Sequence, residues 1–312
     1  MKLVWVTGAH GFLGRHLCQY MSGKGFSVAG IGHGYWDPRE SSKWGIETWV
    51  FSDVHLPALN DLEGKTSKPY AIFHAAGSGS VPMSLRNPYI DFQRTVCTTL
   101  DVLEYVRLRS PETKLIYPSS AAVYGAVIKG KISEETPLNP VSPYGVHKKI
   151  AESLIGSYAT SFGLPICVVR FFSLFGNGLM KQLLWDICCR LEENDREIVL
   201  HGTGDEIRDW IHIDDAAGLV GIAMEKASSS ATPVNGGTGE GATVREIVHE
   251  IVDAFGINRI QIKFSGIIRE GDPRFYQADI SKALSWNWNP LWDWRDGIRE
   301  YVRWFKKMRG LK

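Results

Sequence analysis

The sequence predicts an α/β protein whose central sheet is parallel and doubly wound. Over the first 170 residues, short apolar runs alternate with longer segments of helical periodicity, which is the pattern of repeated strand–helix–strand units. A glycine-rich turn follows the first run directly and precedes a helical segment, as expected where a parallel sheet meets a ligand. The short runs are Leu3–Thr7, Ser27–Ile31, Ala71–His74, Lys114–Pro118 and Pro165–Arg170.

Composition limits the class of protein. A chain of 312 residues buries a core without disulfides or metals. Its 35 Lys and Arg residues balance 34 Asp and Glu residues, which argues against nucleic acid or an anionic membrane as partner. The five cysteines show no metal-ligand spacing, and no run approaches the roughly 18 apolar residues of a membrane span. We therefore expect a cytoplasmic protein without a metal site.

The turn GAHGFLG at residues 8–14 has the spacing of a dinucleotide-binding loop. Glycines at these positions permit a tight turn and a close approach of the backbone to a pyrophosphate, and the following helix presents its N–H groups to the same anion. The residues expected to contact the cofactor here are Gly8, Gly11, Phe12, Leu13 and Gly14.

The end of the second strand-like run bears on the choice of cofactor. NAD sites usually carry an acidic residue about 20 residues after the turn, where it binds the ribose hydroxyls. Residues 30–34 read GIGHG and contain no carboxylate. His33 or Arg39 would then be able to face a 2′-phosphate, so the sequence favours NADP(H), with NAD(H) as the alternative.

Two further segments carry candidate catalytic residues. Ser120 follows the run Lys114–Pro118, at the carboxyl end of a predicted strand. Tyr144 and Lys148 are four residues apart at the start of a predicted helix, so they share one face. An ammonium one turn from a phenol is expected to lower the phenol's pKa and to let it exchange protons near neutral pH.

Taken together, these motifs resemble the extended short-chain dehydrogenase/reductase family, in its nucleotide-sugar epimerase, dehydratase and reductase branch. The resemblance implies a Rossmann-type fold with Tyr144 as acid/base, Lys148 on the nicotinamide ribose and Ser120 on the reacting oxygen. It also implies adenine contacts at Asp53 and Val54. The segment HAAG adds Ala75, Ala76 and Gly77 to the cofactor site.

The same resemblance places substrate residues in the second half of the chain. Arg208 in GDEIRDWIHIDD and Arg269 in REGDPRFYQAD match arginines that bind a nucleotide diphosphate, as a guanidinium does through paired bonds. Ser173 stands where many relatives have Asn beside the phosphate, and Thr95 where an Asn is common near the nicotinamide.

The division of the chain follows from these motifs. Residues 1–175 are predicted to form the dinucleotide-binding domain, and residues 176–312 a smaller, mainly substrate-binding C-terminal lobe, with elements around 207–237 interleaved with the sheet. In this lobe we expect helices around 181–193, 214–227 and 244–255, and a hairpin-like segment at 201–213.

Three functions remain open. Dehydration by this family needs an Asp-Glu pair at the positions of Ala121 and Ala122, so a 4,6-dehydratase is excluded. The first reading is NADPH-dependent reduction of a nucleotide-linked 4-keto sugar, with Tyr144 as proton donor. The alternative is an NAD-dependent 4-epimerase, and the third is a cofactor-binding module without catalysis.

The resemblance also implies a homodimer. Its contact would be formed by helices at Tyr89–Arg107 and Tyr144–Ser161. Leu100, Leu103 and Val106 would supply the apolar stripe of that contact, or would pack on the sheet instead.

Overall fold

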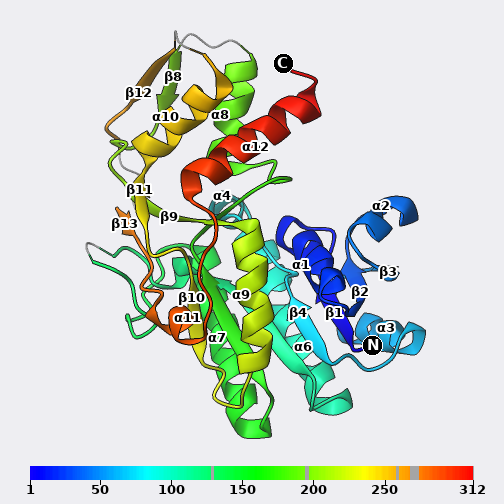
Figure 1. Ribbon diagram of the computed structural model, residues 1–312. Helices are drawn as coiled ribbons and strands as arrows, with labels where there is room; N and C mark the ends of the chain where they lie inside the picture. Colours follow the sequence, from blue (N-terminus) through cyan, green and yellow to red (C-terminus); the bar gives the residue numbers. More distant parts are fainter. Residues whose placement is uncertain (128–129, 194–196, 258–259, 268–273, 312) are drawn as a thin grey trace.

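A seven-stranded parallel sheet forms the centre of the protein (Figure 1). The computed structural model describes residues 1–127, 130–193, 197–257, 260–267 and 274–311. The strand order is β10-β6-β5-β4-β1-β2-β3, so the direction of progression reverses between β1 and β4, where ligands bind in sheets of this type. The strands are β1 (Leu3–Thr7), β2 (Ser27–Gly32), β3 (Thr48–Phe51), β4 (Ala71–His74), β5 (Lys114–Ser120), β6 (Ile166–Phe171) and β10 (Pro233–Gly236).

The predicted fold class is confirmed, and the five predicted strands correspond to β1, β2, β4, β5 and β6. β3 and β10 occupy the two edges of the sheet. Each has only four residues, and β10 begins with Pro233, which an edge strand tolerates because its N–H is not needed on the outer side.

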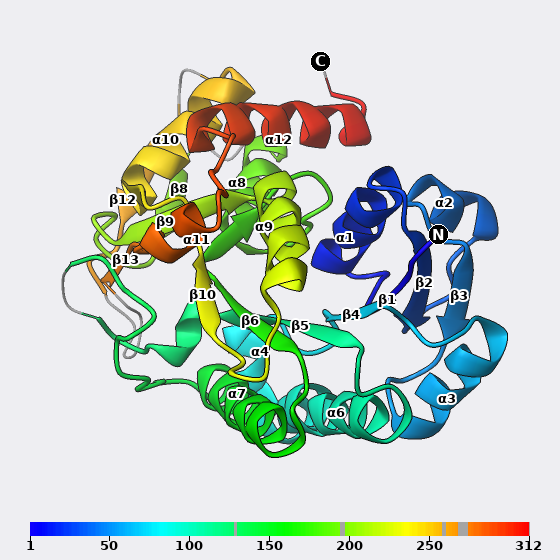
Figure 2. The ribbon, with the colours of Figure 1, turned by 60° about the horizontal axis from the view of Figure 1, so that its bottom comes forward.

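Helices cover both faces of the sheet (Figure 2). On one face lie α1 (Phe12–Gly23) and α9 (Ile213–Lys226); on the other lie α3 (Leu56–Lys65), α6 (Thr98–Arg109) and α7 (Pro143–Phe162). In β1, Val4 and Val6 belong to one core cluster and Trp5 to another, because successive side chains point to opposite faces. Both faces are therefore apolar, as a sandwiched parallel sheet requires.

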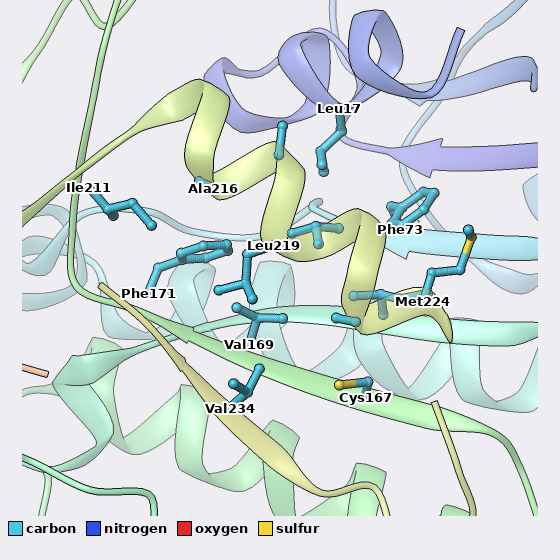
Figure 3. Close-up of a cluster of buried hydrophobic side chains, with 14 of the residues drawn as sticks. Leu17, Phe73, Cys167, Val169, Phe171, Ile211, Ala216, Leu219, Met224 and Val234 are labelled. Carbon is cyan, nitrogen blue, oxygen red and sulfur yellow. The ribbon is translucent and has the colours of Figure 1, made fainter. Parts of the chain in front are cut away.

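The helix α9 shows how the second half of the chain contributes to this core (Figure 3). Leu219 of α9 is fully buried beside Val169 and Phe171 of β6, and Leu17 of α1 belongs to the same core cluster. Burial of such a side chain contributes about 2 kcal/mol. The sheet thus depends on residues that come after the predicted domain boundary, and that boundary itself stays a prediction.

Short elements connect the strands on the carboxyl side of the sheet. After β2 comes α2 (Pro38–Lys43). After β4 come α4 (Val81–Arg86), α5 (Pro88–Phe92) and a π-helical turn, η1 (Gln93–Cys97), which continues directly into α6. A 3₁₀ turn, η2 (Ala121–Val123), follows β5. Among these connections, α2 carries Arg39, α4 carries Ser84 and α5 carries Asp91, which are described in the next subsection.

The C-terminal lobe has its own apolar core, which includes Phe175, Ile247, Ile298 and Phe305. Its helices are α8 (Gln182–Glu192), α10 (Val244–Phe255), α11 (Ser281–Ser285) and α12 (Trp294–Arg309). Its strands are β7 (Ser173–Phe175), β8 (Glu197–Leu200), β9 (Ile207–His212), β11 (Gly241–Thr243), β12 (Gln261–Phe264) and β13 (Phe275–Tyr276).

The expected hairpin at 201–213 is wrong. β8 pairs with β12 in parallel, whereas β9 lies in a different sheet with β7, β11 and β13. The turn between β8 and β9 folds around the carboxylate of Glu206, which accepts hydrogen bonds from the backbone N–H groups of Thr203 and Gly204. A locally closed turn of this kind redirects the chain into the second sheet.

Polar contacts join the two lobes beside α1. His16 of α1 donates from Nε2 to the carbonyl oxygen of Asn177, at 3.0 Å. The side chain of Asn177 in turn donates to Glu300 of α12. None of the helices within the described residues combines the length and apolar character needed to span a bilayer.

Candidate active site

The glycine turn forms a cradle at the switch point of the sheet. Gly8 has a φ of +66°, and a Cβ there would lie 2.7 Å from the backbone nitrogen of Ala76. A Cβ at Gly14 would lie 2.2 Å from the carbonyl oxygen of Gly8. Gly11 caps α1 without a side-chain hydrogen bond, so the N–H groups of Phe12 and Leu13 are not used within the helix. An anion fits this position.

A buried hydrogen-bonded chain holds the turn against the end of β4. Thr7 Oγ1 lies 2.8 Å from His74 Nδ1 and also accepts from the N–H of Ala76, at 3.1 Å. Burial, with the nearby Lys148, lowers the pKa of His74 to about 3, so its ring is neutral. Ala75 and Ala76 thereby lie against the glycine turn, whereas a Cβ at Gly77 would face the carbonyl oxygen of Arg94, at 3.5 Å.

Ser120 and Tyr144 are brought together at the carboxyl end of β5. Ser120 is the last residue of β5, and Tyr144 lies in the first turn of α7. Their side chains form a hydrogen bond, which partly offsets a rise in the pKa of Tyr144 that burial causes. The hydroxyl is therefore protonated and faces a serine that can share its proton.

Lys148 has a different relation to Tyr144 from the one that spacing predicts. Its Nζ donates to the carbonyl oxygen of Pro118, at 2.9 Å, and lies 4.6 Å from the ring centre of Tyr117. Burial lowers the pKa of Lys148 to about 8, although Glu152 and Asp91 counteract this. The expected lowering of the Tyr144 pKa by this amine is not observed, because the amine is directed to a backbone carbonyl.

Several groups that hold α7 were missed in the sequence. Ser142 caps the helix by accepting from the N–H of Gly145, and Ser84 accepts from the N–H of Tyr144, at 3.1 Å. His147 Nδ1 lies 2.6 Å from Asp91 Oδ2. A Ser directly before Pro143 is a recognisable cap signal, but no local pattern connects His147 with a residue 56 positions earlier.

The packing at the end of β2 accounts for the missing carboxylate there. A Cβ at Gly32, the last residue of β2, would lie 3.2 Å from the indole of Trp49. A Cβ at Gly30 would lie 3.1 Å from the same ring. Trp49 thus fills the space into which an acidic side chain at the end of β2 would extend.

The two expected phosphate ligands are both paired with carboxylates. His33 Nδ1 lies 3.0 Å from Asp53 Oδ1, and both side chains are exposed. Arg39 lies on α2 with 92% of its side chain exposed, and its Nε is 3.5 Å from Asp37. Val54 is buried behind Asp53. A carboxylate therefore does reach this end of the site, from the segment just after β3 instead of from β2.

A cavity of about 460 Å³ opens between α8, β8 and β9 in the C-terminal lobe. Arg208 of β9 lines it and donates to the carbonyl oxygen of Ile207, at 2.9 Å. Ser173 on β7 is in register with Trp210, two residues from Arg208, so both expected substrate residues lie on one small sheet. Arg269 lies outside the described residues. Sequence reasoning missed the other wall residues, which include Leu183, Asp186, Arg190, Val199 and His201.

Comparisons with known proteins identify the family of the chain. The sequence profile of the NAD dependent epimerase/dehydratase family matches residues 4–236. YtcB of Bacillus subtilis, described as an uncharacterised UDP-glucose epimerase, is 30% identical over 318 residues, which cover 99% of each chain.

Solved structures extend the likeness to the whole fold. The UDP-glucose 4-epimerase of Thermus thermophilus in complex with NAD is 26% identical, with a TM-score of 0.87 over 97% of this chain and 99% of that chain. The UDP-N-acetylglucosamine 4-epimerase of Methanobrevibacter ruminantium, in complex with UDP-N-acetylmuramic acid, is 26% identical, with a TM-score of 0.86 over 98% and 99% of the two chains.

These findings overturn the expectation of NADP(H). The matching family is described as NAD dependent, and the Thermus thermophilus relative holds NAD. The physical reason lies at the end of β2, where a side chain at Gly32 would crowd Trp49 and where Asp53, just after β3, brings a carboxylate to His33. A 2′-phosphate would meet that negative charge.

Proposed function

Because the chain belongs to the NAD dependent epimerase/dehydratase family, in its nucleotide-sugar epimerase branch, we propose that it is an NAD-dependent 4-epimerase of a nucleotide-linked hexose. The observation that carries the proposal is the hydrogen bond between Ser120 and Tyr144 at the carboxyl end of β5, next to the glycine cradle. This arrangement places a proton-sharing phenol where a sugar hydroxyl and a nicotinamide ring would meet.

The residues of the cradle fit a dinucleotide. Any side chain at Gly8 or Gly14 would occupy the space next to the turn, and the first turn of α1 contains no acidic residue that would repel a pyrophosphate. We assign the pyrophosphate to the N–H groups of residues 11–14, and the adenosine to the end of the site with His33 and Asp53. When bound, NAD would take a hydride from the sugar and return it to the opposite face.

The chain's own side chains would move the proton. Tyr144 takes the proton of the reacting hydroxyl and gives it back when the hydroxyl re-forms, while Ser120 holds the same oxygen by a hydrogen bond. Lys148, held by the carbonyl of Pro118, binds the nicotinamide ribose and contributes positive charge below its pKa of about 8.

The substrate would be bound by its diphosphate and base in the cavity beside β9. Arg208 is assigned to the diphosphate, with Ser173 beside it and Arg269 as a second arginine from the sequence motif. The apolar wall residues Leu183 and Val199 offer contact to a flat base, and the relatives act on UDP-linked sugars. We therefore propose a UDP-hexose.

Other reactions of the family fit less well. Ala121 and Ala122 lack the acid and base that a 4,6-dehydratase needs. Reduction of a 4-keto sugar by NADPH loses its main support once the end of β2 is explained by Trp49. Epimerisation needs no group that the site lacks.

The experiment compares the purified protein with its Tyr144→Phe variant on a panel of UDP-hexoses with added NAD. We expect interconversion of 4-epimers without net change in nicotinamide absorbance, and a loss of turnover of about 100-fold or more in the variant. Stoichiometric oxidation of NADPH by a 4-keto sugar nucleotide would support the reductase instead. Turnover that survives in Tyr144→Phe would refute the assignment of the acid/base.

We also propose a homodimer. Of the two alternatives for Leu103 and Val106, the structure has the second, because both are fully buried and pack on the sheet. Three apolar side chains of these helices are 36–40% exposed: Leu100 on α6, and Val146 and Ile150 on α7. We assign them to the dimer contact. A second copy packed on these helices would bury them.

A further inference from the structure

We infer that the buried pair of Asp91 and His147 is a positioning element of the active site, which orients the catalytic face of α7 and sets the charge around it. The inference deepens the proposed function and rests on it. Neither residue belongs to the set that the sequence motifs identify.

The contact is short and shielded from water. His147 Nδ1 lies 2.6 Å from Asp91 Oδ2, with side chains 11% and 2% exposed. The ring of Phe92 packs edge-on against the imidazole, with centroids 5.4 Å apart. The second oxygen, Oδ1 of Asp91, is buried without a hydrogen-bond partner among the described residues. A carboxylate in that state costs stability, so packing alone does not account for it.

The position of the pair on α7 connects it with catalysis. His147 comes three residues after Tyr144 and directly before Lys148, so its ring occupies the same turn as both. Asp91 lies on α5, outside this helix. The bond between them therefore fixes the rotation of α7 about its own axis, while Ser84 fixes the helix start through the N–H of Tyr144.

The pair also places a negative charge beside both catalytic groups. The charge of Asp91 raises the pKa of Tyr144 and that of Lys148. The other groups that face Tyr144 or Lys148 are Ser120 and Tyr117 from β5, Glu152 from α7, and the neutral His74 from β4. Among these, Glu152 is the only other carboxylate, and it is bound by Arg170. Loss of the charge of Asp91 would thus move both pKa values in the same direction, downwards.

The test uses Asp91→Asn, which keeps the size and an acceptor for His147. We expect the pH profile of kcat to move to lower pH and kcat at neutral pH to fall tenfold or more, with KM little changed. His147→Ala should lower kcat similarly, and His147→Asn, which restores a donor near the position of Nδ1, should recover most of it. These histidine variants also decide the matter if Asp91→Asn does not fold.

The matched control is Tyr158→Phe. Tyr158, further along α7, donates to Glu104 of α6 at 2.6 Å, so its loss removes a tie of α7 away from the active site. We expect this variant to be less stable but to keep the pH profile of the wild type. If Tyr158→Phe shifts the profile as Asp91→Asn does, or if Asp91→Asn leaves it unchanged, the inference is overturned.

A second readout separates this inference from the proposed function. The ultraviolet absorbance of tyrosinate, measured in each background against its Tyr144→Phe counterpart, follows the ionisation of Tyr144 without any turnover. Asp91→Asn should lower the midpoint of this titration, and an unchanged midpoint would contradict the pair's role. If no nucleotide sugar is converted by the wild type, the proposed function fails while the titration still decides on the pair.

Discussion

The indole of Trp49 closes over Gly32, so that a Cβ on this glycine would stand 3.2 Å from the ring. The end of β2 is the position where NAD-binding folds of this type usually carry a carboxylate. Here an aromatic ring from β3 occupies the space, and Asp53 at the end of that same strand brings a carboxylate to His33. One packing contact therefore decides how the adenosine end is built.

Introducing the usual carboxylate should not improve this site. In Gly32→Asp, the new side chain must displace Trp49, and we expect a loss of about 1–3 kcal/mol in the free energy of unfolding with no gain in NAD affinity. Denaturant unfolding and titration with NAD measure both. Gly64→Asp, at a glycine of α3 with open space at its Cβ position, is the control. Tighter NAD binding by Gly32→Asp without loss of stability would contradict the interpretation.

The buried ammonium of Lys148 should lower the free energy of unfolding of the protein at neutral pH. Its pKa is about 8 in the folded protein, against an ordinary value of 10.5. The unfolded chain holds this proton more tightly than the folded protein does. Below pH 8 the lysine is charged in both states, and burial of the ammonium lowers the free energy of unfolding by up to about 3 kcal/mol. This cost falls as the pH rises from 8 towards 10.5. Lys148→Met should therefore be inactive yet more stable at pH 7, with its advantage shrinking at higher pH. Urea unfolding of both proteins at pH 7 and near pH 10 measures the difference in stability. A variant that is less stable than the wild type at both pH values would refute the prediction.

Arg208 should act on substrate binding. In Arg208→Ala we expect KM for the nucleotide sugar to rise about 10- to 100-fold, with a smaller change in kcat and an unchanged melting temperature. Arg208→Lys should restore little, because a lysine cannot form the paired bonds of a guanidinium. Arg269→Ala is expected to behave similarly. Steady-state kinetics measure each effect. An unaltered KM in Arg208→Ala would refute the assignment of the diphosphate to Arg208.

The proposed dimer gives a prediction about mass. Sedimentation should show twice the chain mass of 34.9 kDa at micromolar concentration. A charge in the middle of the exposed apolar surface, as in Val146→Asp combined with Ile150→Asp, should yield monomers because an unpaired carboxylate cannot be buried cheaply. Leu108→Asp, at an exposed residue of α6 outside this group, is the control. A monomeric wild type would contradict the proposal.

Much of the fold could be predicted because the sheet is sandwiched and its strands are continuous apolar runs. β1, β2, β4, β5 and β6 have this character. The strands at the two edges are short and weakly patterned, so periodicity says little about them. The error at 201–213 had another cause. Glycines around a loop indicate a turn, but not which strand pairs on its far side; here the turn closes on the carboxylate of Glu206, and β8 and β9 pair in different sheets.

Site residues could be predicted where they stand in short sequence motifs. They could not be predicted where they depend on contacts between distant segments. Ser120 and Tyr144 were expected together and are together, because the carboxyl end of β5 and the start of α7 are adjacent. Asp91 gave no signal, since its partner lies on another helix. The prediction of NADP(H) was wrong because the absence of a carboxylate in residues 30–34 was taken as a sign of a 2′-phosphate, whereas the ring of Trp49 lies against the Cβ position of Gly32.

The contacts between the lobes have a consequence for how the molecule assembles. His16 and Asn177 are 161 positions apart, and Asn177 and Glu300 are 123 apart. Closing such large loops is slow, because the entropy of the intervening chain is lost before the bonds form. Helix α1, to which we assign the pyrophosphate, therefore gains its contact with the C-terminal lobe late in folding. During refolding, we expect the core of the sheet to form before the protein recovers its affinity for dinucleotide.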